Sequence, residues 1–140
     1  MARALSADAI TLSIPHAKPY HGVARLVVGG LGARLNLSYE HLEDLQLALE
    51  SVLERDGYVV GEEVTVRLQV EPDAVTMTIG PLDPRELQAD LAGPSGDGIS
   101  LSRLLATLVE EVELEEVDGE HRLRLEKRVP MTRPEPREPV

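Results

Sequence analysis

The sequence predicts an α+β two-layer sandwich, in which helices cover one face of a mixed, mostly antiparallel sheet. Strand-like alternation occurs in two adjacent pairs, at residues 64–70 with 75–79 and at 112–117 with 121–127. Helix-periodic segments stand between these pairs, and one further strand followed by two helices precedes them. Two consecutive helices after the first strand exclude a simple alternating β-α-β pattern.

The first half of the chain begins with a short strand at residues 9–14, in which Ile10, Leu12 and Ile14 share one face. Residues 20–35 follow a helical period in spite of three glycines, each of which costs a helix about 1 kcal/mol relative to alanine. We interpret these glycines as a site of close packing against a neighbouring element, with a functional kink as the alternative. They are Gly29, Gly30 and Gly32.

The next helix carries the clearest amphipathic pattern in the chain. Ser38 is a good N-cap, and the residues at 56–57 close the helix. Its apolar face is wide enough to cover a sheet, and it consists of Leu42, Leu45, Leu49, Val52 and Leu53.

The second half contains the two strand pairs. A turn at residues 71–74 joins the first pair, and Gly80-Pro81 is expected to end it. Pro84 then opens a short helix at 85–91, a Gly/Pro loop spans 92–98, and a helix runs from Ser100 to about Glu113. Asp118-Gly119 is a strong hairpin signal between the last two strands.

Length and composition indicate one domain at residues 1–129, followed by a Pro- and charge-rich tail at 130–140 that is expected to be disordered. The chain has no Cys, Phe or Trp, so the core is aliphatic. The absence of Cys excludes a disulfide framework, a thiolate zinc site and a cysteine nucleophile. Its four histidines show no metal-ligand spacing.

The formal net charge of −11 argues against nucleic acid and against an anionic membrane surface, since both need a positive footprint. A basic protein segment would suit such a chain. The first residues lack an apolar signal core, and no run reaches transmembrane length, so we expect a cytoplasmic protein.

One motif suggests phosphate binding. Gly96 and Gly98 stand just before a predicted helix, where bare amides and the positive helix end can face an anion. Glycines also simply end loops and start helices, so the motif has this structural alternative.

The order of elements resembles the histidine-kinase-like ATPase superfamily, with its Bergerat-type ATPase fold, and more narrowly its anti-sigma-factor serine/threonine kinase branch in bacteria. Residues 43–51 are similar to the nucleotide-site helix of that family, 80–84 to its first glycine box and 95–99 to its second. The segment 12–15 and the final hairpin are also typical, and the resemblance spans residues 10–129. It implies ATP and magnesium as cofactors, nucleotide contacts at Gly80, Gly96 and Gly98, and a homodimer.

Three positions depart from the family pattern. An ungapped alignment puts the family's catalytic carboxylate at Ser51, its magnesium-binding amide at Arg55 and its adenine-reading aspartate at Thr78. Arg55 could contact phosphate directly, or be a surface residue. A shift of one residue would offer Glu50 as base and Glu54 as metal ligand, but it turns the helix by about 100° and spoils its apolar face.

The changed positions predict a protein that kept the family's shape and lost its phosphoryl transfer, because that reaction depends on positioning and on a metal ion. Such a protein would act by binding a sigma factor or an anti-sigma antagonist. The first alternative is an active serine/threonine kinase with a remodelled site around Glu50 or Glu54. The second is an ATPase-fold interaction or dimerisation domain unrelated to sigma regulation.

Overall fold

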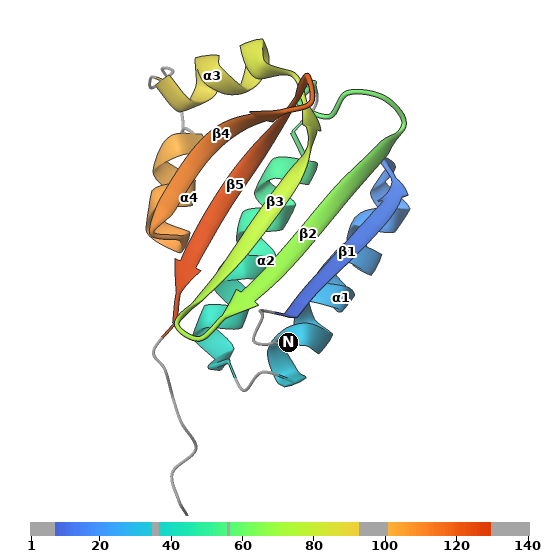
Figure 1. The fold of residues 1–140 in the computed structure, drawn as a ribbon. Helices are drawn as coiled ribbons and strands as arrows, with labels where there is room; N and C mark the ends of the chain where they lie inside the picture. Colours follow the sequence, from blue (N-terminus) through green and yellow to red (C-terminus); the bar gives the residue numbers. More distant parts are fainter. Residues whose placement is uncertain (1–7, 35–36, 56, 93–100, 130–140) are drawn as a thin grey trace, which may run out of the picture.

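The computed structural model describes residues 8–34, 37–55, 57–92 and 101–129, and it confirms the predicted order of elements. Five strands form one sheet in the order β1-β2-β3-β5-β4 (Figure 1). The elements are β1 (Asp8–Pro15), α1 (Lys18–Arg34), α2 (Tyr39–Leu53), β2 (Glu63–Glu71), β3 (Ala74–Leu82), α3 (Pro84–Ala92), α4 (Leu101–Leu108), β4 (Glu111–Val117) and β5 (Glu120–Arg128). The predicted tail at 130–140, the loop with Gly96 and Gly98, and Asp56 lie outside the described residues.

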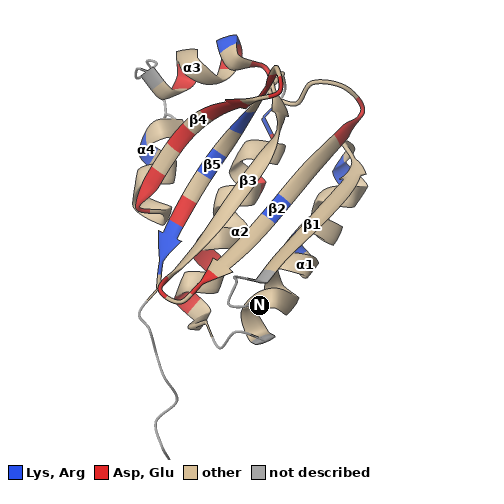
Figure 2. Ribbon diagram, viewed as in Figure 1, with Lys and Arg blue, Asp and Glu red and all other residues tan. Residues whose placement is uncertain are grey.

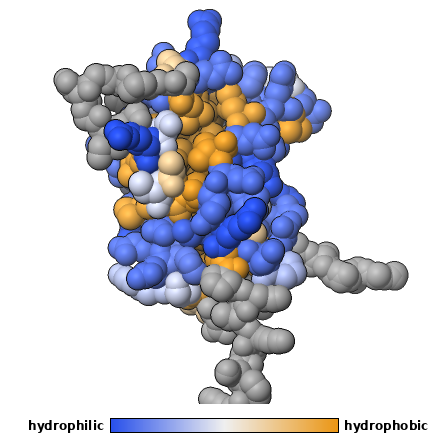
Figure 3. Space-filling model, turned by 90° about the vertical axis from the view of Figure 1, so that its left-hand side faces the viewer, coloured by the Kyte–Doolittle hydropathy of each residue, from blue (hydrophilic) through white to orange (hydrophobic). Residues whose placement is uncertain are grey.

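The α+β two-layer sandwich is confirmed, with helices α1, α2 and α4 packed behind the sheet (Figure 1). Figure 3 views the side of the molecule that carries α3 and α4, where apolar residues gather in the middle and hydrophilic residues surround them. All four described strand pairs are antiparallel, so the sheet is antiparallel throughout rather than mixed. Alternation sorts the side chains of β2 between the two faces. Val64, Val66 and Leu68 are buried beneath the helices, whereas Thr65 and Arg67 point to the open face.

Helix α2 lies between α1 and α4 and supplies the centre of the core. Its cap is confirmed, since the Ser38 hydroxyl oxygen accepts a hydrogen bond from the His41 amide at 3.1 Å. Leu45, Leu49 and Val52 are at most 1% exposed, as the amphipathic pattern predicts.

The glycines of α1 are explained by helix packing, which confirms that interpretation for two of them. A Cβ at Gly29 would lie 2.9 Å from Gln46 Nε2, and one at Gly32 would overlap the Leu42 side chain; both neighbours belong to α2. Gly30 has nothing within 4 Å of its Cβ position, so no contact explains it.

Three predicted boundaries are wrong. Helix α2 ends at Leu53 and not at the predicted residues 56–57, so Glu54 and Arg55 lie beyond it. Gly80-Pro81 does not end the first hairpin, because β3 continues through a cis Gly80-Pro81 peptide to Leu82. The helix expected to reach Glu113 ends at Leu108, and β4 begins at Glu111. Here tertiary contacts override the helical period: the Glu110 amide bonds the Glu126 carbonyl at 3.0 Å, and Lys127 Nζ bonds the Leu108 carbonyl at 2.8 Å.

The last hairpin is as predicted. Asp118 and Gly119 have φ angles of 54° and 82°, the positive values that a tight turn between twisted strands requires. Among the described helices, none is long and apolar enough to cross a lipid bilayer.

Candidate functional site

The residues expected to bind a nucleotide are divided between α2 and the segment that follows it. Ser51 and Glu50 belong to the last turn of α2, whereas Glu54 is its C-cap and Arg55 follows the helix, because α2 ends at Leu53. Arg55 lies near Tyr58 and acts on its ionisation. Glu50 and Glu54 line a hollow together with Lys18 and His21, near the start of α1. The structure therefore does not bring these two candidate pairs together.

The Ser51 hydroxyl is engaged within its own helix. Its Oγ donates to the Leu47 carbonyl at 2.7 Å, a common back-bond of helical serines. A hydroxyl also lacks the basicity that a general base needs near neutral pH. Ser51 thus fits a small helix residue better than a catalytic one.

The carboxylates that a shifted alignment would use face α1. Arg25 Nη1 donates to Glu50 Oε2 at 2.7 Å, so Glu50 is already in an ion pair. The side-chain amide of Gln46 bonds the Arg25 carbonyl at 3.1 Å, which ties the same two helices together. Glu50 therefore joins α1 to α2, and the geometry does not favour the remodelled kinase site.

Thr78 and Gly80 lie on β3, and both line a hollow on the open face of the sheet. Ser51 belongs to α2 behind the sheet and Arg55 to the segment after α2, and neither lines this hollow, so the structure does not bring Thr78 to them. A Cβ at Gly80 would lie 2.9 Å from Arg122 Cγ and 3.0 Å from the His121 carbonyl oxygen. The close approach of β5 therefore explains why residue 80 is a glycine, and a contact with phosphate is not needed to explain it.

The first glycine box has few amides left for an anion. Pro81 and Pro84 carry no N–H. The Asp83 amide donates to the Tyr58 carbonyl at 2.7 Å, while the Pro81 carbonyl accepts from the Val60 amide at 3.0 Å. The segment is thus held by residues 58–60 on one side and by β5 on the other. It resembles a strand end more than a phosphate cradle.

Sequence reasoning missed a polar cluster at the end of α2. The buried Tyr58 donates its hydroxyl hydrogen to Asp90 Oδ2 on α3. Burial, and next the bond to Asp90, raise the pKa of Tyr58 well above its usual value, while Arg55 acts in the opposite direction. The cluster connects the end of α2 to α3. Its only sequence signal is a tyrosine in a chain with three aromatic residues.

Lys127 was also missed. Its ammonium group is 8% exposed, lies on the core side of β5, and donates to Asp44 Oδ2 at 2.9 Å. The alternation Leu123, Leu125, Lys127 could have revealed a lysine at a core-facing position.

The described residues do not fit the magnesium ion that the resemblance implies. No group of three or more His, Asp or Glu side chains in the described ranges could hold a metal ion. At the family's metal position Arg55 presents a cation, whereas magnesium prefers oxygen ligands.

His21 on α1 has an unusual environment. Its Nε2 atom is buried without a hydrogen-bond partner among the described residues, and its ring stacks on His16 at a centroid distance of 5.5 Å. Burial, and next the charge of His16, lower the pKa of His21 below 6.5. Lys18 acts in the same direction, whereas Glu54 and Glu50 oppose it.

This environment predicts a pH-dependent stability. Below about pH 6.5 the unfolded chain protonates this histidine more readily than the native state does, so the free energy of unfolding falls as the pH falls. Urea unfolding at several pH values between 5 and 8 measures the slope. His21→Gln should flatten it, and His41→Gln on α2 should leave it as in the wild type. An unchanged slope in His21→Gln would contradict the assignment.

No model of a known protein family matches the chain. It is 28% identical over 134 residues to the serine-protein kinase RsbW of Bacillus pumilus, covering 80% of this chain and 81% of that protein. It is also 28% identical over 128 residues to the protein of that name from Listeria monocytogenes, covering 76% and 79%. These matches confirm the predicted resemblance to the anti-sigma-factor serine kinase branch.

A solved structure shows the same fold. The crystal structure of the RsbU and RsbW domains of a Mycobacterium tuberculosis protein superposes with a TM-score of 0.63 at 12% identity. The match covers 87% of this chain but 32% of that longer chain.

Proposed function

Starting from this similarity to serine-protein kinases RsbW, we propose that the chain regulates by binding a sigma factor or an anti-sigma antagonist rather than by transferring a phosphoryl group. The similarity to the RsbW kinases supports a regulatory role of the same kind. The absence of phosphoryl transfer is argued from the chain's own residues.

The observation that carries the proposal is the set of residues at the end of α2. Ser51 bonds its own helix through its hydroxyl, and Arg55, just after the helix, lies beside Tyr58. Glu50 is held in an ion pair with Arg25 of α1. Loss of both the base and the metal ligand should slow phosphoryl transfer by several powers of ten. ATP and magnesium are therefore not cofactors in this proposal.

A protein partner needs an accessible apolar surface, and α1 presents one. Leu26 is 74% exposed, while Val23 and Tyr20 on the same helix are 40% and 43% exposed. By contrast, Leu31 belongs to the core. We propose that the partner covers this surface of α1. The homodimer that the resemblance implies stays a prediction.

The test measures both the binding of partner proteins and the transfer of phosphate from ATP. The purified chain is incubated with sigma factors and antagonist proteins of its own organism, with labelled ATP and magnesium, beside the B. pumilus kinase as a positive control. We expect a stable complex without nucleotide, no labelled antagonist, and no magnesium-dependent heat of ATP binding in calorimetry. Labelled antagonist, or ATP binding that needs magnesium, would refute the absence of phosphoryl transfer.

Two matched variants locate the surface. Leu26→Asp should lower the affinity for the partner about tenfold or more, because a carboxylate would be desolvated at an apolar interface. Leu47→Asp, at a 41% exposed position of α2, should bind as the wild type does. Equal binding by all three proteins would show that the partner lies elsewhere.

A further inference from the structure

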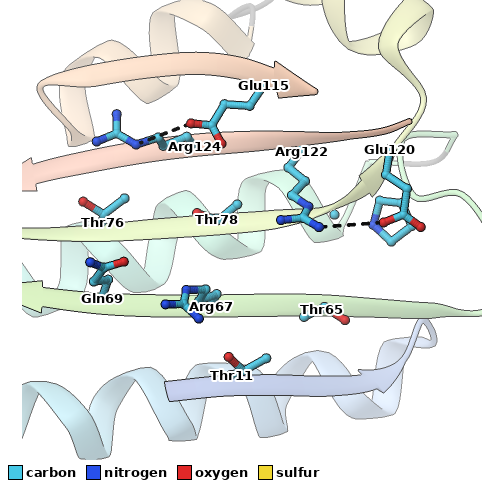
Figure 4. A pocket seen from close by; sticks show the side chains of 12 residues that line it. Thr11, Thr65, Arg67, Gln69, Thr76, Thr78, Glu115, Glu120, Arg122 and Arg124 are labelled. Carbon is cyan, nitrogen blue, oxygen red and sulfur yellow. Dashed lines mark ion pairs between the residues drawn. The ribbon is translucent and has the colours of Figure 1, made fainter. Parts of the chain in front are cut away.

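The open face of the sheet carries a polar hollow of about 470 Å³ (Figure 4). Its lining includes three arginines and two glutamates, whereas acidic residues dominate the chain, whose formal net charge is −11. Figure 2 shows these basic residues on β2 and β5, beside the acidic β4. The charged residues of the lining are Arg67, Arg122, Arg124, Glu115 and Glu120.

Arg67 stands in the middle of this face. Its register partners are Thr11 on β1 and Thr78 on β3, both of which line the hollow. Within the described part of the chain, the exposed Arg67 guanidinium makes no ion pair or hydrogen bond. Its five donors are thus available to a ligand.

Arg122 reaches the same hollow because residue 80 is a glycine. The Cβ position of Gly80 lies 2.9 Å from Arg122 Cγ, so a side chain there would displace the arginine stem. Figure 4 shows the Arg122 guanidinium lying over β3, next to Thr78 along the strand. Its ion pair with Glu120 is long, at 3.9 Å, and Glu120 is 57% exposed. Such a pair holds the arginine weakly.

Arg124 has a different role. Four carboxylates lie within 3.3 to 4.0 Å of its guanidinium nitrogens, so they more than balance its single charge. Thr78 lies between Arg67 and Arg124 in the register, and its hydroxyl can donate to a ligand. The guanidinium donors open to a ligand in the hollow are therefore those of Arg67 and Arg122.

We propose that this hollow binds an oxyanion, phosphoryl or carboxylate, between the guanidinium groups of Arg67 and Arg122 above Thr78. Guanidinium groups bond such oxygens in pairs, and these charge-assisted hydrogen bonds are the strong ones. The volume suits a small molecule or one anionic group of a larger ligand. The site lies on the face opposite to α2, and it does not depend on the proposed regulatory function.

The test is a titration of the ¹⁵N-labelled full chain by NMR at low ionic strength, first with inorganic phosphate and then with citrate. We expect shifts of the amides around Arg67, Thr78 and Arg122. Arg67→Gln and Arg122→Gln should each weaken binding about tenfold, in line with the loss of one hydrogen bond to a charged group. Arg85→Gln, an exposed arginine on α3 outside the hollow, should bind as the wild type does.

The two probes separate the sources of the oxyanion. Binding of phosphate alone indicates a phosphoryl ligand, binding of citrate alone a carboxylate, and binding of both the shared chemistry. The proposal is overturned if neither probe shifts these amides, if the shifts lie around Arg55 instead, or if Arg67→Gln keeps the wild-type affinity.

Discussion

Lys127→Met is expected to lower the free energy of unfolding by about 2–3 kcal/mol, because it breaks a buried ion pair from one side. The Lys127 ammonium donates to Asp44 Oδ2 at 2.9 Å and to the Leu108 carbonyl at 2.8 Å. Methionine fills a similar volume but leaves both oxygens without their donor. The Asp44 side chain is 31% exposed, so water recovers part of the loss. Urea unfolding followed by circular dichroism measures the change.

The neighbouring Arg128 provides the matched control. It lies on the same strand, is 59% exposed, and its ion pairs with Glu111 and Glu126 are 3.9 and 3.7 Å long. Arg128→Met should change stability by no more than about 0.5 kcal/mol. In a double variant, Asp44→Leu should offset part of the cost of Lys127→Met, since no partner is then left uncompensated. Equal effects of the two single methionine variants would show that Lys127 is not a structural ion-pair residue.

Gly80→Ala is expected to destabilise the protein by about 1–3 kcal/mol, the usual cost of overpacking. The new Cβ would lie 3.0 Å from the His121 carbonyl oxygen and 3.3 Å from Arg122 Cα. These are backbone atoms of β5, which can move only together with the sheet. The register between β3 and β5 already shifts between Ile79 and Leu82, so the strain falls where the ladder is irregular. Thermal unfolding of the variant, without any nucleotide, tests this.

Gly30→Ala is the control for the same chemical change. Its Cβ would have nothing within 4 Å, and alanine favours the helical backbone by about 0.8–1.0 kcal/mol. This variant should therefore be more stable than the wild type. If Gly80→Ala were as stable as the wild type, packing would no longer explain the glycine.

The sequence predicted the secondary structure correctly wherever a single periodic pattern placed apolar residues on one face of the core. The strand alternation, the Ser38 cap and the positive φ angles of the last turn are all found where the residues predicted them. The prediction was wrong where a helical pattern and a strand pattern overlapped. Residues 109–113 continue a helical period, but α4 ends at Leu108 and residues 111–113 pair with β5 as part of β4.

The candidate site shows the same limit. Spacing along the chain predicted Ser51, Arg55, Glu50 and Glu54 on one helix, but α2 ends at Leu53, before Glu54 and Arg55. The spacing also does not tell which neighbour each side chain contacts. The contacts of Glu50 with α1, and of Arg55 with Tyr58, arise from segments up to 25 residues away along the chain. A sequence pattern alone does not carry that information.

The sequence by itself determined the fold class, the aliphatic core and the resemblance to a kinase family, because hydrophobic periodicity and composition are local properties of the chain. Only the tertiary structure decided the roles of the charged residues and of the glycines. Three residues have roles that depend on neighbours that folding brings from other strands. They are the lysine on the core side of β5, the glycine under the Arg122 stem, and Arg67, which has no ion pair among the described residues. The physical reason is that burial and ion pairing depend on distance in space, which a one-dimensional pattern does not set.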